Sequence, residues 1–73
     1  MNYFRVFLMA NIDPRVADKY NVKAGTVTDA IDMAKDMMFR RLSLQGKCIL
    51  ENDIEVLLVT DACGEKVDFI EEK

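Results

Sequence analysis

Residues 25–46, GTVTDAIDMAKDMMFRRLSLQG, decide the fold, because they hold the clearest helical pattern in the chain. At 100° per residue, apolar side chains of this segment gather on one face. That face comprises Val27, Ala30, Ile31, Ala34, Met38 and Leu42. Acidic side chains and Arg40 lie on the opposite face, as expected for a helix that covers a core on one side and meets water on the other.

Signals at both ends bound this helix. Thr26 is a favourable N-cap residue and is followed three positions later by an acid, which is a variant of the capping box. Arg40 and Arg41 lie in the last turns, where the helix dipole favours cations. Gly46 is a suitable C-terminal stop. We therefore expect a helix from about Val27 to Leu44.

The segment before the helix predicts strands. Tyr3 to Asn11 is rich in aromatic and branched residues, and Arg5 is the main interruption of its apolar run. Asp13-Pro14 is typical of a helix start, with Asp at the N-cap and Pro at the first helical position. We therefore expect one irregular helical turn over Pro14 to Lys19. Tyr20 to Ala24 is suited to a second short strand that closes a hairpin with the first.

The segment after Gly46 also has β character. Lys47 to Glu51 and Ile54 to Thr60 are strand-like, and the residues between them are suited to a tight turn or a bulge. Residues 61–65 are typical of a hairpin loop, with Gly64 at the left-handed position that such loops need. Val67 to Glu71 alternates well enough to be a last strand.

This order of elements predicts an α+β two-layer sandwich, in which one amphipathic helix packs on a small, mainly antiparallel sheet. The 73 residues have room for one domain. Domains of this size usually need a disulfide, a metal or a partner subunit for stability. With two cysteines, Cys48 and Cys63, and no histidine, we expect free thiols in a reducing compartment and no metal. A partner subunit is the remaining source of additional stability.

Charge and motifs narrow the function further. The net charge is −3, from 13 acidic and 10 basic residues, which weakens the case for nucleic-acid binding. No run approaches the ~20 apolar residues that span a bilayer, and residues 1–10 lack the features of a signal peptide. We expect a cytoplasmic protein. The chain offers no nucleophile–base pair, metal ligand set or glycine-rich loop, so we predict that it is not an enzyme and binds no cofactor.

Two charged clusters have two interpretations each. Asp29, Asp32 and Asp36 form a stripe on the exposed helix face, which is either a solvated surface or a dock for a basic partner. Arg40, Arg41 and Lys47 lie near the helix C-terminus. They either neutralise the free carbonyl groups there or contact phosphate.

Two predicted strands have apolar residues on both faces. Strict alternation in Ile54 to Thr60 places Leu57 and Val59 on the face opposite Ile54, Val56 and Leu58. In the first strand, Phe7 and Met9 lie opposite the other apolar residues in the same way. One helix covers one face, and soluble monomers rarely expose a large apolar patch on the other. The expected contact residues for a partner are Phe7, Met9, Leu57 and Val59, with Met33 and Phe39 as an apolar border of the helix. A one-residue slip in register would exchange the strand residues with their neighbours.

The sequence thus predicts a small, non-catalytic protein-binding module that acts as a dimer or within a complex. Regulators or inhibitors encoded by phages and mobile elements share this size, acidity and lack of chemistry. Two alternatives stay open. One is a nucleic-acid-associated module that uses the sheet face, although Arg5 stands alone among the aromatic residues of the first strand. The other is a small thiol-dependent enzyme that uses Cys63 in its hairpin loop.

Overall fold

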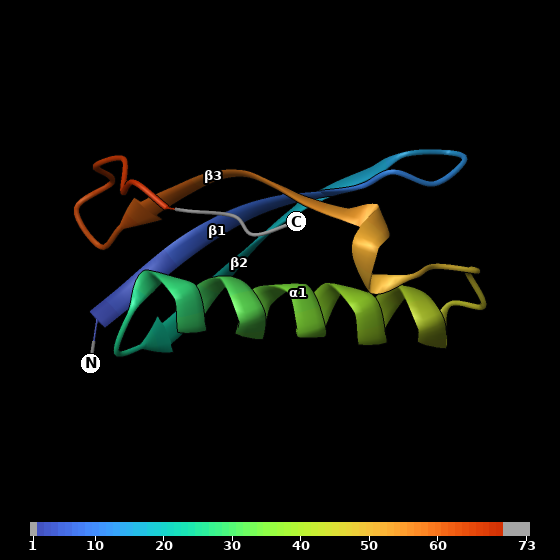
Figure 1. The fold of residues 1–73 in the computed structure, drawn as a ribbon, viewed down its shortest axis with the longest axis horizontal. Coiled ribbons are helices and arrows are strands. Elements are labelled where there is room, and N and C mark those ends of the chain that lie inside the picture. Colours follow the sequence, from blue (N-terminus) through green and yellow to red (C-terminus); the bar gives the residue numbers. More distant parts are fainter. Residues whose placement is uncertain (1, 70–73) are drawn as a thin grey trace.

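The computed structural model describes residues 2–69 as one helix packed on an antiparallel sheet (Figure 1). The elements in chain order are β1 (Asn2–Ala10), β2 (Val16–Ala24), α1 (Val27–Leu44), the short 3₁₀ helix η1 (Glu51–Asp53) and β3 (Ile54–Asp61). Within these residues the sheet has three strands in the order β2-β1-β3, so that β1 is central. The predicted α+β two-layer fold is confirmed.

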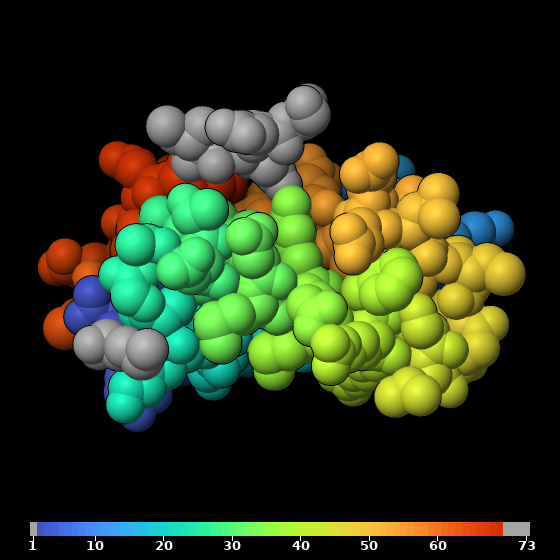
Figure 2. Space-filling view, turned by 60° about the horizontal axis from the view of Figure 1, so that its bottom comes forward, coloured from blue at the N-terminus to red at the C-terminus, as the bar shows by residue number. Residues whose placement is uncertain are grey.

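The core lies between the helix and one face of the sheet. Val6 and Leu8 on β1 are fully buried and face the helix, where Ala34 and Met38 are also fully buried. The predicted helix bounds are confirmed, and the Thr26 hydroxyl caps the helix by accepting a hydrogen bond from the Asp29 amide at 3.2 Å. Figure 2 shows the helix layer from outside, where α1 extends across most of the molecule.

The second strand is longer than expected. The hairpin between β1 and β2 is confirmed, but the helical turn over Pro14 to Lys19 is wrong, because β2 already begins at Val16. Asp-Pro is typical of turns as well as of helix starts, and here Asp13-Pro14 belongs to the hairpin loop, with a cis peptide bond between them. Burial along β2 alternates from residue to residue, which is the period of a strand.

The segments flanking β3 differ from the expectation. Lys47 to Glu51 is not a strand, since residues 47–50 are irregular and η1 follows. The hairpin loop after β3 is confirmed, with Gly64 at a φ of 85°. The predicted last strand is wrong over residues 67–69, which are irregular; one isolated bridge, between Thr60 and Lys66, lies just before them. The end of that prediction, residues 70–71, lies outside the described residues.

A bulge in β3 changes which side chains face the helix. The pairing with β1 shifts by one residue between Phe7 and Leu8, so that Leu57 and Leu58 together lie opposite Phe7. Beyond the bulge, Val59 lies opposite Val6 and is fully buried in the core. The predicted placement of Val59 beside Leu57 is therefore wrong, because strict alternation does not hold across the extra residue.

Candidate binding surface

The face of the sheet away from α1, here called the open face, carries every second residue of β1 and the residues opposite them on the neighbouring strands. β1 contributes Tyr3, Arg5, Phe7 and Met9; β2 contributes Lys23, Asn21, Lys19 and Ala17; and β3 contributes Thr60, Leu58, Leu57 and Glu55. Within the part of the chain that the structure describes, no helix covers this face. The open face is therefore the candidate site.

One half of the open face is apolar. Phe7 and Met9 are half-buried, and Leu57, in the bulge of β3, is 51% exposed. Phe7, Leu57 and Ala17 line a shallow groove of about 320 Å³, together with Lys19 at its border. This groove is suited to an apolar side chain from a partner, because such a contact would remove Leu57 from water.

The other half is cationic and aromatic. The Nζ atom of Lys23 lies 5.4 Å from the centroid of the Tyr3 ring, within the range of a cation–π contact. The Arg5 Nε donates a hydrogen bond of 3.0 Å to Asn21 Oδ1, which holds the guanidinium group on the surface of the sheet. Tyr3, Arg5, Asn21 and Thr60 line a second hollow of about 510 Å³, which the loop after β3 closes on one side.

Charge is distributed unequally between the two sides of the molecule. Among the described residues of the open face, Glu55 is the one acid, against three bases. The exposed face of α1 carries the stripe Asp29, Asp32 and Asp36, of which Asp36 pairs with Arg40 at 3.1 Å. A net-acidic protein thus presents a basic surface on its sheet, and an acidic partner would be attracted to that surface.

The structure brings together half of the predicted contact residues. Phe7, Met9 and Leu57 are neighbours on the open face. Val59 lies in the core instead. Met33, which is 44% exposed, and Phe39, which packs against the core, belong to the helix layer on the other side of the sheet. They do not extend the open face.

The sequence interpretation missed the bases beside the aromatic residues. Arg5 was expected to stand alone, but Lys19 and Lys23 from β2 lie opposite Phe7 and Tyr3. Pairing between β1 and β2 brings the lysines and the aromatic residues together. Spacing along the chain therefore does not reveal that they are neighbours. The two-residue period of residues 16–24 was the available signal, because it places both lysines on the same face of a strand.

The remaining chemical groups are dispersed. Among residues 2–69, no three His, Cys, Asp or Glu side chains are arranged to hold a metal ion. Cys48 and Cys63 are exposed free thiols. None of the described helices is both long and apolar enough to span a bilayer.

Comparisons with known proteins identify no relative, so a function has to be inferred from the open face itself. No protein-family model matches the chain, and neither the curated proteins nor the solved structures include a significant match.

Proposed function

We propose that this chain is a non-catalytic protein-binding module whose open face receives an acidic, partly apolar segment of a partner protein. The observation that supports this proposal most directly is the apolar groove at Phe7 and Leu57 beside exposed bases. A module of this kind acts by occupying a surface of its partner, as small regulators and inhibitors do.

The two halves of the open face would contribute differently to such a complex. Burial of Leu57 and completed burial of Phe7 would supply affinity, because apolar anchors at the centre of an interface carry most of the binding free energy. Arg5, Lys19 and Lys23 would attract acidic segments and fix their orientation, which affects association rate and specificity more than affinity. The expected ligand therefore combines a large apolar side chain with neighbouring carboxylates.

A single-stranded nucleic acid is the second candidate, favoured by the cationic half. Tyr3 is 58% exposed and lies next to Lys23, with Arg5 two residues along the strand. An aromatic ring between basic side chains is typical of protein surfaces that stack nucleotides and contact phosphate. We place this candidate second because the three basic side chains of the open face can neutralise few phosphates. The net charge of the chain is also −3, which opposes nucleic-acid binding.

Selection from a displayed random-peptide library tests the proposal. The wild-type chain should enrich peptides with an aromatic or aliphatic residue flanked by Asp or Glu. Leu57→Glu should bind the enriched peptides at least about tenfold more weakly, which corresponds to the loss of one anchor. Leu50→Glu is the matched control, because Leu50 is also exposed but lies outside the open face, and its affinity should stay at the wild-type value.

A thymidine oligonucleotide of about 20 nucleotides distinguishes the second candidate in the same assay format. If the chain acts on protein, peptide binding survives moderate salt, and oligonucleotide binding stays weak. Tight oligonucleotide binding that falls steeply with salt and is lost in Tyr3→Ala would favour nucleic acid instead. A library that yields no peptide dependent on Leu57 would contradict the proposed protein-binding role.

A further inference from the structure

The outer edge of β2 has no strand beside it in the described part of the chain, since the order β2-β1-β3 places β2 at the border of the sheet. The other border is partly occupied, because the Val67 amide donates a hydrogen bond of 2.8 Å to the Val59 carbonyl. β2 is nine residues long. A long edge presents a row of backbone donors and acceptors that can pair with another strand.

A band of exposed apolar side chains on α1 lies beside this edge. Met33 and Met37 are each 44% exposed, and Leu44 is 89% exposed. Together with Arg41 they form one side of the helix, here called the helix flank, because residues four apart share a side. Arg41 pairs with Asp18 of β2, so the helix flank faces the β2 edge.

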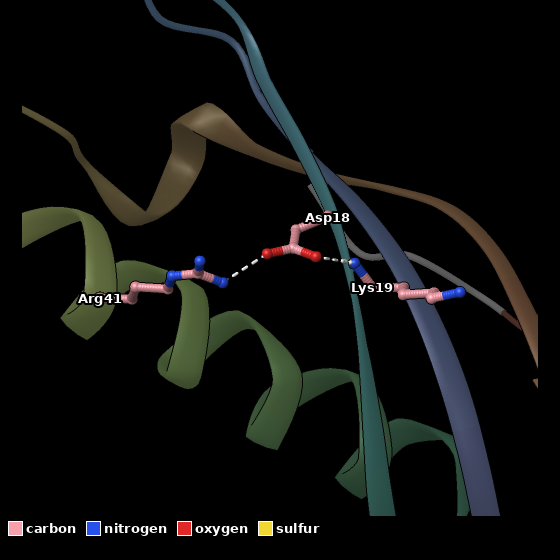
Figure 3. Close-up of polar contacts among 3 residues, drawn as sticks. All are labelled: Asp18, Lys19 and Arg41. Carbon is pink, nitrogen blue, oxygen red and sulfur yellow. Dashed lines mark hydrogen bonds and ion pairs between the residues drawn. The ribbon is translucent and has the colours of Figure 1, made fainter.

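Figure 3 shows how this ion pair connects the two layers. The Asp18 carboxylate reaches Arg41 with one oxygen, and the other accepts a hydrogen bond of 2.8 Å from the Lys19 amide. A hydrogen bond with Tyr20 and the charge of Asp18 raise the pKa of Arg41 above its ordinary value. The side chain of Lys19 extends away from the helix (Figure 3).

The helix flank runs parallel to the β2 edge. From Val27 to Arg41 the helix rises about 21 Å, and from Ala24 back to Asp18 the strand covers about 20 Å. The helix therefore returns alongside β2, and Met37 lies nearly level with Tyr20, the middle residue of the strand.

We propose that two copies of this chain associate through the β2 edges, in antiparallel register about a two-fold axis at Tyr20. The product is a continuous sheet of twice three strands, with the two helices side by side and Met33 and Met37 of each helix flank between them. This interface is separate from the open face and does not depend on the proposed function.

The number of paired residues and the charges of the lysines together favour this register. With the axis at Tyr20, all nine residues of β2 lie opposite residues of the second copy. Lys19 lies opposite Asn21, and its amide would exchange the hydrogen bond to the Asp18 carboxylate for one to the second copy. An axis at Lys19 would place two lysines directly opposite each other, and an axis at Asn21 would place Lys19 opposite Lys23. Directly opposed like charges destabilise an antiparallel pair, so Tyr20 is the favoured centre.

The spacing of the helices is also suitable. α1 packs mainly on β2 and β1 and less on β3. Strands are about 4.8 Å apart, so a helix above the gap between β1 and β2 lies about 2.4 Å inside β2. Two such helices would then be about 10 Å apart, at the upper end of the distance at which helices pack directly. The exposed methionines of the helix flank are flexible enough to fill the space between them.

Dimerisation would join the two open faces into one surface. Lys19 and Lys23 of one copy would lie diagonally across from lysines of the other, where their charges repel without direct opposition. Added salt screens this repulsion. The dimer should therefore tighten as salt increases, whereas binding of an acidic ligand to the open face should weaken.

Sedimentation velocity of the purified chain over roughly 1–100 µM tests the proposal. The wild type should shift from monomer to dimer in this range. Met37→Lys places two further cations close to the axis and should raise the dimer Kd at least about tenfold. Leu50→Lys adds the same charge at an exposed leucine outside the helix flank and should leave Kd unchanged. A wild type that stays monomeric would overturn the proposal.

Cysteine cross-linking tests the register in a Cys48→Ser, Cys63→Ser background. Tyr20→Cys should form a disulfide-linked dimer on mild oxidation, because paired residues lie about 5 Å apart between Cα atoms. Lys23→Cys should not, because its copy would be about 20 Å away along the strands. If Lys23→Cys cross-links and Tyr20→Cys does not, or if a wild-type dimer is indifferent to Met37→Lys, the copies associate through another surface.

Discussion

The two faces of the sheet carry similar residues in different surroundings. On β1, Leu8 is fully buried beneath α1, whereas its neighbour Met9 is half-buried on the open face. On β3, Val59 is fully buried, whereas Leu57 is 51% exposed. Residue type alone therefore does not identify the core of this protein. The position of the helix decides which apolar side chains stabilise the fold and which remain available to a partner.

The largest difference between the faces is expected for a charge introduced on β3. Val59→Asp places a carboxylate in the core without a partner, at a cost of several kcal/mol. A domain of 73 residues has a total stability of only about 4–11 kcal/mol, so this variant should be largely unfolded by far-UV circular dichroism. Leu57→Asp should keep the wild-type spectrum. A folded Val59→Asp together with an unfolded Leu57→Asp would mean that the bulge is misplaced.

A smaller difference is expected for truncation on β1. Leu8→Ala removes three buried carbons and leaves a cavity, which should lower the free energy of unfolding by about 2–5 kcal/mol. Met9→Ala removes a half-buried side chain and should cost less than about 1.5 kcal/mol. Urea denaturation of both variants measures the difference. Equal losses would indicate that a second copy or another segment covers Met9 in solution.

The face of the sheet that packs against α1, here called the covered face, was largely predictable from the sequence. Periodicity and end signals gave the bounds of α1, and five of its six predicted core residues are buried while Val27 is half-buried. These features are local, because a helix forms its hydrogen bonds and its apolar face within one segment. The α+β class follows from the same helix, since its single apolar face requires a sheet to cover.

The open face was predictable only in part, because it depends on pairing between distant segments. Residues 54–60 hold five apolar residues, and either register of this strand buries a similar set. The bulge at Leu57 therefore cannot be recognised from the hydrophobic pattern. Because strict alternation was assumed, Val59 was predicted on the wrong face of the sheet. The Asp13-Pro14 signal shortened β2 in the same interpretation and left Lys19, which lies beside Phe7, outside the predicted strand. Lys23 was inside that strand, but its place beside Tyr3 depends on the pairing register.

The N-terminal cap of α1 provides a prediction of about 1 kcal/mol in the free energy of unfolding. Thr26→Ala removes the hydroxyl that accepts the Asp29 amide, and loss of such a cap typically costs about 1 kcal/mol. Thr28→Ala is the matched control inside the helix, where Ala is favoured over Thr by a few tenths of a kcal/mol. The two variants should therefore change the thermal midpoint in opposite directions. A shared direction would show that the hydroxyl of Thr26 does not act as a cap.

The smallest effect on stability is expected for cysteine probes, which distinguish the faces by chemistry. Cys48 and Cys63 are exposed, so replacing both by Ser should change the free energy of unfolding by no more than about 0.5 kcal/mol. In that background Leu57→Cys should also be well tolerated and should react with a thiol reagent at the rate of a free thiol. Val59→Cys should react only through unfolding, because a buried thiol is inaccessible to the reagent. The ratio of the two rates then measures the protection that the helix gives to the covered face. Slow modification of Leu57→Cys that becomes fast on dilution would instead place this residue in a contact between two copies.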